Sequence, residues 1–139
     1  MLVAKYVAQR EASSMNAIGI SRLGQVHIPA QDVERATGFY KDMLGLSLLF
    51  TTNGMAFFNC GGVRLMLSRP EGTDSQSGSI LYFSVPDIAA AHNRLTQGGV
   101  RFEAEPRKIA EMPTHDLWMA FFRDSEQNLM ALMSEVPRN

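Results

Sequence analysis

The sequence has one cysteine, Cys60, among its 139 residues. A single cysteine cannot form an internal disulfide, which excludes a disulfide-stabilised scaffold. It fits a reducing compartment, and we expect a cytoplasmic protein. Nothing near Cys60 marks it as a nucleophile, so an inert buried thiol is expected there.

Long apolar runs and an excess of one charge are also missing. No apolar run approaches the roughly 20 residues of a membrane helix. Lysine and arginine number 13 against 14 for aspartate and glutamate. This balance gives no electrostatic reason to expect nucleic acid or an anionic membrane as a partner. There is no phosphate-binding loop, dinucleotide fingerprint, CxxC pair or serine-centred elbow.

Residues 1–21 are expected to form an N-terminal arm outside the domain. Charged residues such as Lys5 interrupt its apolar stretch, so a signal peptide is not expected. Leu2 and Tyr6 fall on one helical face, so the arm suits docking on the domain or on a partner. The alternative is a start-site extension, with the domain beginning at Met15.

The most informative feature is an internal repeat. The string MAFF occurs at 55–58 and again at 119–122, and each copy leads into an apolar run. A helix signal also repeats, because Asp32 and Asp87 each precede apolar residues at the same helical spacing. Repeated units of this size predict two copies of one supersecondary motif, with the functional site in the space between them.

Periodicity and turn residues predict the elements of each copy. Glycine-containing pairs at 53–54 and 61–62 are typical of two-residue hairpin turns. Strands are expected at 24–29, 46–52, 55–60, 63–68, 80–85, 100–104, 117–123 and 128–134, with a loop at 105–114 and one helix after each aspartate N-cap. We therefore expect an α+β fold of two βαβββ modules in tandem. They form one domain, 22–139, with modules at 22–68 and 80–135 joined by a linker at 69–79.

Two segments of the sequence resemble a known family. Residues 23–46, LGQVHIPAQDVERATGFYKDMLGL, resemble the opening of vicinal-oxygen-chelate proteins, which include glyoxalase I, bleomycin-resistance proteins and extradiol dioxygenases. Residues 121–133, FFRDSEQNLMALM, resemble the final hairpin of the same family. The resemblance implies the fold more strongly than the reaction, because this superfamily hosts many chemistries. It also implies a homodimer.

Metal-dependent members of that family hold a divalent ion at four positions. The resemblance places these positions at Gln25, Met66, Ile80 and Ala131. Apolar side chains cannot hold Mn, Fe, Ni or Zn, and no carboxylate remains to balance the charge of the ion. Gln25 alone offers a neutral amide, which is a poor ligand, so we expect the usual metal site to be lost and no cofactor to be bound.

Polar residues at strand positions provide candidates for a ligand site. Gln25 and His27 share one strand face, and the repeat matches His27 to Tyr82. Ser84 and Arg64 lie on the same predicted faces. This set suits a small anionic or polar molecule, with His27 and Tyr82 as candidate catalytic groups and the other three as binding groups. The alternative for His27 and Tyr82 is a structural role in the core.

His115 and Trp118 are further candidates for substrate binding, since they stand together at the start of the seventh strand. Trp118 offers a flat apolar wall and His115 a polar group near a cavity mouth. Each has a structural alternative, and for Arg64 that alternative is an internal salt bridge with Glu103 or Asp116. His92, among polar helix positions, is expected to face solvent.

Three functions remain open from the sequence. The first is a glyoxalase- or bleomycin-resistance-like protein that binds or converts a small polar metabolite without a metal. The second is a metal-dependent lyase, isomerase or dioxygenase whose ligands are relocated to His27 and His115 with a carboxylate such as Glu103 or Asp116. The third sequesters a drug or metabolite without turnover. If the protein is an enzyme, a lyase or isomerase of glyoxalase type is expected.

Overall fold

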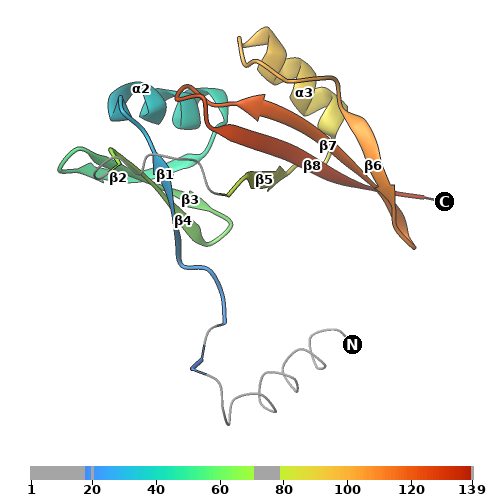
Figure 1. Cartoon of the computed structure of the whole chain (residues 1–139), viewed down its shortest axis with the longest axis horizontal. Helices are drawn as coiled ribbons and strands as arrows, with labels where there is room; N and C mark the ends of the chain where they lie inside the picture. Colours follow the sequence, from blue (N-terminus) through green and yellow to red (C-terminus); the bar gives the residue numbers. More distant parts are fainter. Residues whose placement is uncertain (1–17, 20, 71–78, 139) are drawn as a thin grey trace.

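A computed structural model of the chain describes residues 18–19, 21–70 and 79–138 and contains two four-stranded sheets (Figure 1). Most of the expected N-terminal arm and linker lies outside these residues. The elements are β1 (Gln25–Pro29), α2 (Val33–Gly38), the π-helical segment η1 (Phe39–Met43), β2 (Ser47–Thr52), β3 (Met55–Cys60), β4 (Val63–Ser68), β5 (Leu81–Ser84), α3 (Ile88–Gln97), β6 (Arg107–Glu111), β7 (His115–Arg123) and β8 (Leu129–Pro137). No helix in the described part of the chain is long and apolar enough to cross a membrane.

The two sheets have the same topology. Sheet A, from the first module, has the order β1-β4-β3-β2, and sheet B, from the second, has the order β5-β8-β7-β6. In each sheet the first strand pairs in parallel with the last strand of its module, and the other neighbours are antiparallel. The predicted α+β fold of two βαβββ modules is confirmed.

The predicted local signals shape the first module. Asp32 caps α2, its side chain accepting a hydrogen bond from the Arg35 amide at 3.0 Å. Asn53 and Gly54 both have positive φ, as a two-residue hairpin turn requires. The helix itself ends differently from a regular one, since the Leu44 amide bonds to the Phe39 carbonyl five residues back, which widens its last turn.

One predicted strand is wrong. Residues 100–104 form only an isolated bridge, Phe102 with Phe122, while the fourth strand of sheet B is β6, inside the segment expected to be a loop. β6 is a short edge strand with the sequence RKIAE, and its pairing with β7 shifts register between Lys108 and Ala110. Charged edge strands with a register shift show no clean alternation, which explains why the sequence pattern missed it.

A single apolar core joins the two modules. It includes Tyr40 and Phe58 from the first module and Phe122 from the second, all fully buried. The C-terminal ends of η1 and α3 also meet. Met43 of η1 lies against Gly98, the C-cap of α3, so closely that a Cβ added at Gly98 would lie 2.6 Å from Met43 Cε. Figure 1 shows α2 and α3 on the same side of the strands, so no helix of the described residues covers the opposite face of either sheet, called its open face below.

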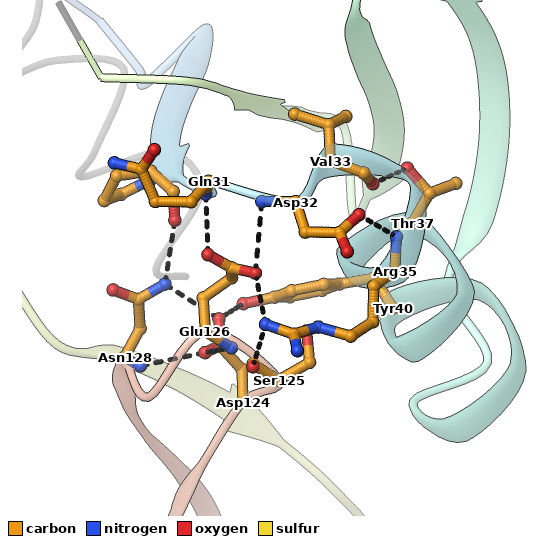
Figure 2. A network of polar contacts seen from close by, with 11 residues as sticks. Gln31, Asp32, Val33, Arg35, Thr37, Tyr40, Asp124, Ser125, Glu126 and Asn128 are labelled. Carbon is orange, nitrogen blue, oxygen red and sulfur yellow. Dashed lines mark hydrogen bonds and ion pairs between the residues drawn. The ribbon is translucent and has the colours of Figure 1, made fainter.

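A turn of the second module holds the first module through hydrogen bonds (Figure 2). This turn, residues 124–128, is called the Asp124 turn below. The buried Asp124 carboxylate accepts from the Tyr40 hydroxyl at 2.7 Å, from the amides of Glu126 and Asn128, and from the Asn128 side chain. The Asn128 side chain also donates to the Pro29 carbonyl at 3.1 Å.

Glu126 extends this contact to the start of α2. Its carboxylate, with only 7% of the side chain exposed, accepts from the Gln31 amide at 2.6 Å and from Arg35 at 2.8 Å. A carboxylate beside the first turn of a helix also offsets the positive end of the helix dipole. The second module therefore supplies part of the N-terminal cap of the first module's helix.

The buried Tyr40–Asp124 pair makes a prediction about stability and pH. Burial, and next the Asp124 charge, raise the pKa of Tyr40 above its ordinary value of 10.0. Above about pH 10 the unfolded chain releases the tyrosine proton while the folded chain keeps it, so stability falls as pH rises. Tyr40→Phe should lower the free energy of unfolding by about 1–3 kcal/mol at pH 7, because a buried carboxylate loses a donor.

Urea denaturation at several pH values measures both effects. Between about pH 10 and 11 the wild-type protein should lose up to about 1.4 kcal/mol more per pH unit than Tyr40→Phe. Tyr82→Phe, which removes an exposed phenol, is the matched control and should keep the wild-type slope. Equal slopes for Tyr40→Phe and wild type would contradict a protonated Tyr40 in the folded state.

Candidate functional site

The open face of sheet A carries the polar residues that strand alternation predicted. Gln25 lies opposite Arg64 and His27 lies opposite Met66 in the parallel pairing of β1 with β4. Paired residues share a face, so these four side chains lie side by side on the side away from α2. Their chain neighbours, such as Leu65, turn into the core instead.

Arg64 is held in a fixed orientation on this face. Its Nε donates to Gln25 Oε1 at 2.8 Å, and its Cζ lies 5.4 Å from the centre of the Phe57 ring. Phe57 in turn stacks on Phe50, with ring centres 4.6 Å apart. The hydrogen bond fixes one edge of the guanidinium and the aromatic ring supports it, an arrangement that favours a cation.

A hollow of about 540 Å³ opens beside Arg64. Two arginines, two amide side chains and one apolar side chain contribute to its lining: Arg22, Arg64, Gln25, Asn59 and Leu49. None of the described residues that line it carries a carboxylate. The hollow is therefore positively charged and rich in hydrogen-bond donors.

His27 lies on the same face, two residues along β1 from Gln25 and outside this hollow. Its Nε2 is 2.7 Å from Ser68 Oγ, and the side chain is exposed. The hydrogen bond orients the ring while leaving it open to solvent. An exposed imidazole held in this way is able to exchange a proton with a bound molecule.

The open face of sheet B is more apolar than that of sheet A. Tyr82 and Ser84 lie on it, and Tyr82 packs edge-on against Phe121 with ring centres 5.9 Å apart. A second hollow, of about 220 Å³, is lined by apolar side chains that include Met119, Phe121 and Leu129. Glu103, Glu105 and Arg107 also contribute to its lining.

The two groups of candidates lie on separate sheets. His27 bonds Ser68 and Tyr82 packs on Phe121, and no hydrogen bond or ring contact joins His27 to Tyr82 in the described part of the chain. No described residue lines both hollows. Each module therefore presents its own half of the predicted set.

Trp118 and His115 lie apart from both hollows. Trp118 pairs with the buried Ser134 and packs against the core, on the face of sheet B opposite to Phe121. His115 is the first residue of β7, and its Nε2 lies 3.2 Å from Glu135 Oε2. In the described part of the chain, neither residue makes a hydrogen bond, ion pair or ring contact with Tyr82 or Arg64.

The structural alternative for Arg64, an ion pair with Glu103 or Asp116, is not formed among the described residues. Glu103 pairs with Arg123 and Asp116 with Arg138, while Arg64 bonds Gln25. The expectation that His92 faces solvent is wrong. Its side chain is buried, and the centre of its ring lies 4.4 Å from the centre of the Phe102 ring.

Sequence reasoning missed four side chains at the sheet A hollow: Arg22, Leu49 and Asn59, which line it, and Phe57, which supports Arg64. The signal for two of them was present. A two-residue turn at 61–62 pairs Cys60 with Val63, which sets Asn59 opposite Arg64 and Phe57 opposite Met66. Leu49 reaches the hollow through a register shift between Leu48 and Phe50, which no sequence pattern marks.

Comparisons with known proteins agree with this architecture. A family model described as Glyoxalase/Bleomycin resistance protein/Dioxygenase superfamily matches residues 22–132. The uncharacterized protein YraH of Bacillus subtilis (strain 168) is 30% identical over 127 residues, which cover 80% of this chain and 96% of that protein.

Solved structures show the same fold at lower identity. TnmS3, an antibiotic binding protein from Streptomyces sp. CB03234, superposes with a TM-score of 0.69 at 24% identity, over 86% of this chain and 99% of its own. Lactoylglutathione lyase from Agrobacterium tumefaciens superposes with a TM-score of 0.67 at 19% identity, over 83% of this chain and 94% of its own. These two proteins share a fold while one is an antibiotic binding protein and the other a lyase, so the fold alone does not select a function.

Proposed function

Because the chain belongs to the glyoxalase/bleomycin resistance protein/dioxygenase superfamily, we propose that it binds a small polar organic molecule on its open sheet faces without a divalent metal. The observation that carries this proposal is the pairing of Gln25 with Arg64. Gln25 occupies a position where the resemblance predicts a metal ligand, and its amide oxygen already accepts from a guanidinium at 2.8 Å.

The chemistry of the donor set supports the same conclusion. A fixed positive charge beside Gln25 disfavours a dication, since like charges at hydrogen-bond distance repel. The other expected positions hold a thioether at Met66 and hydrocarbon at Ile80 and Ala131, which do not fit Mn, Fe, Ni or Zn. In the described ranges, no three His, Cys, Asp or Glu side chains come together as a metal site. The relocated ligand set is not favoured either, because His115 and Asp116 are paired elsewhere.

Metal titration tests this part of the proposal. Elemental analysis of untagged protein followed by calorimetric titration with Ni²⁺ and Zn²⁺ should find less than one tightly held ion per chain. The double variant Gln25→His/Met66→Glu restores two ligands on neighbouring strands, whose wild-type side chains approach to 3.8 Å. It should bind either ion at least about 10-fold more tightly than wild type. One stoichiometric ion in the wild-type protein would contradict the proposal.

We also propose that two copies pair, with the open face of sheet A in one protomer opposite that of sheet B in the other. Exposed aromatic and apolar side chains on these faces support this, with Phe50 47% and Tyr82 45% exposed. Sedimentation equilibrium should then give twice the chain mass of 15.4 kDa at micromolar concentration. A single-chain mass throughout that range would contradict the dimer.

Catalysis by His27 is the second candidate function, favoured by the 2.7 Å contact between its exposed imidazole and Ser68. In this alternative the protein is a lyase or isomerase of glyoxalase type, and His27 transfers a proton of the substrate. An assay for formation of lactoylglutathione is a direct first test. If the wild-type protein turns over, His27→Gln should lower kcat by about 100-fold or more, the usual contribution of a general base, with little change in binding.

His92→Gln is the matched control for this test. The same substitution at a histidine that packs against Phe102 should leave kcat within about two-fold. A His27→Gln variant with wild-type kcat would rule out His27 as the base. A wild-type protein that binds its ligand and converts none of it would favour sequestration.

A further inference from the structure

The open face of sheet A contains an arginine in the middle of the sheet. Arg64 lies on β4, an interior strand between β1 and β3, and not at an edge where charged side chains are common. No carboxylate of the described residues lies within ion-pair distance of it. By contrast, Arg35, Arg123 and Arg138 each pair with an acidic side chain.

Among the described residues, none occupies the edge of Arg64 formed by its two terminal nitrogens. Gln25 takes only the Nε–H, and Phe57 lies under the guanidinium plane. Neither terminal nitrogen, Nη1 or Nη2, makes a hydrogen bond to any described residue. Two parallel N–H groups in this position match the two oxygens of a carboxylate or phosphate.

The remainder of the hollow adds to both the charge and the apolar surface. Arg22 supplies a second cation and Asn59 an amide next to Arg64. The register shift in β2 turns two consecutive apolar side chains outward, since Leu49 lines the hollow while Phe50 stacks on Phe57. Leu49 and Phe50 are 50% and 47% exposed, which is a large apolar area beside a charged group.

We propose that this hollow binds a small organic carboxylate, with the carboxylate on Nη1 and Nη2 of Arg64 and the apolar body against Leu49 and Phe50. The inference rests on the proposed function, because it names the ligand class for the same sheet face. The apolar rim favours an organic acid over inorganic phosphate, since a phosphate ion has no surface to place against Leu49 and Phe50.

Titration of the full chain with benzoate, followed by NMR chemical shifts or calorimetry, tests the inference. Benzoate should bind saturably, while benzyl alcohol, which lacks the charge, and inorganic phosphate, which lacks the apolar body, should each bind at least about 10-fold more weakly. Arg64→Gln should weaken benzoate binding at least about 10-fold, and Gln25→Ala should weaken it less by removing only the orienting bond. Arg94→Gln, at an exposed arginine on α3, is the matched control and should bind like wild type.

Several results would overturn the inference. Benzyl alcohol or phosphate binding as tightly as benzoate would show that the charge or the apolar body is not recognised. Benzoate binding unchanged in Arg64→Gln would place the ligand elsewhere. Loss of binding together with a changed sedimentation mass in Arg64→Gln would show that Arg64 acts through assembly and not by direct contact.

Failure of the inference is distinguishable from failure of the proposed function. A wild-type protein that holds a stoichiometric metal and still binds benzoate through Arg64 would contradict metal independence and support the carboxylate site. A metal-free protein that binds benzoate equally well in wild type and Arg64→Gln would support metal independence and contradict the carboxylate site.

Discussion

The two-module architecture depends on the hydrogen bonds that the buried Asp124 carboxylate accepts, above all the one from Tyr40. A buried charge is costly unless donors surround it, and here three donors come from its own turn and one from Tyr40 of the other module. Tyr40 itself is fully buried beside Phe58, at the centre of the first module's core. The hydrogen bond therefore ties the position of the second module to the packing of the first, and with it the relative placement of the two open sheet faces.

Much of the fold follows from short-range signals in the sequence. Asp32 and Asp87 cap their helices as their spacing predicts, and the turns at 53–54 and 61–62 have the positive φ angles that hairpins need. β6 could not be predicted in the same way, because its pairing is decided by β7 and its own charged sequence has no alternating pattern. The buried position of His92 also depends on tertiary packing, in this case against Phe102.

The candidate site shows the same division between local and long-range information. Strand alternation and turn geometry are sufficient to place Gln25, His27 and Arg64 on one face. They do not determine how that face lies relative to Tyr82 on the other sheet, because the relation between modules is fixed by side-chain contacts such as those of the Asp124 turn. Membership of the superfamily gives the fold, whereas the chemistry depends on which side chains replace its usual ligands. At Gln25 the amide oxygen accepts a hydrogen bond from Arg64, so this face carries a fixed positive charge.

The cap that Glu126 provides to α2 has a consequence for how the chain assembles. The bonds from Gln31 and Arg35 to Glu126 are made between side chains and amides that stand more than 90 positions apart in the sequence. Nothing in their geometry requires that both partners belong to the same polypeptide. Two chains that exchanged second modules would form the identical set of contacts, while the covalent connection favours closure within one chain by raising the effective concentration of its own second module. The same contacts that define the folded monomer are therefore also sufficient to define a domain-swapped dimer.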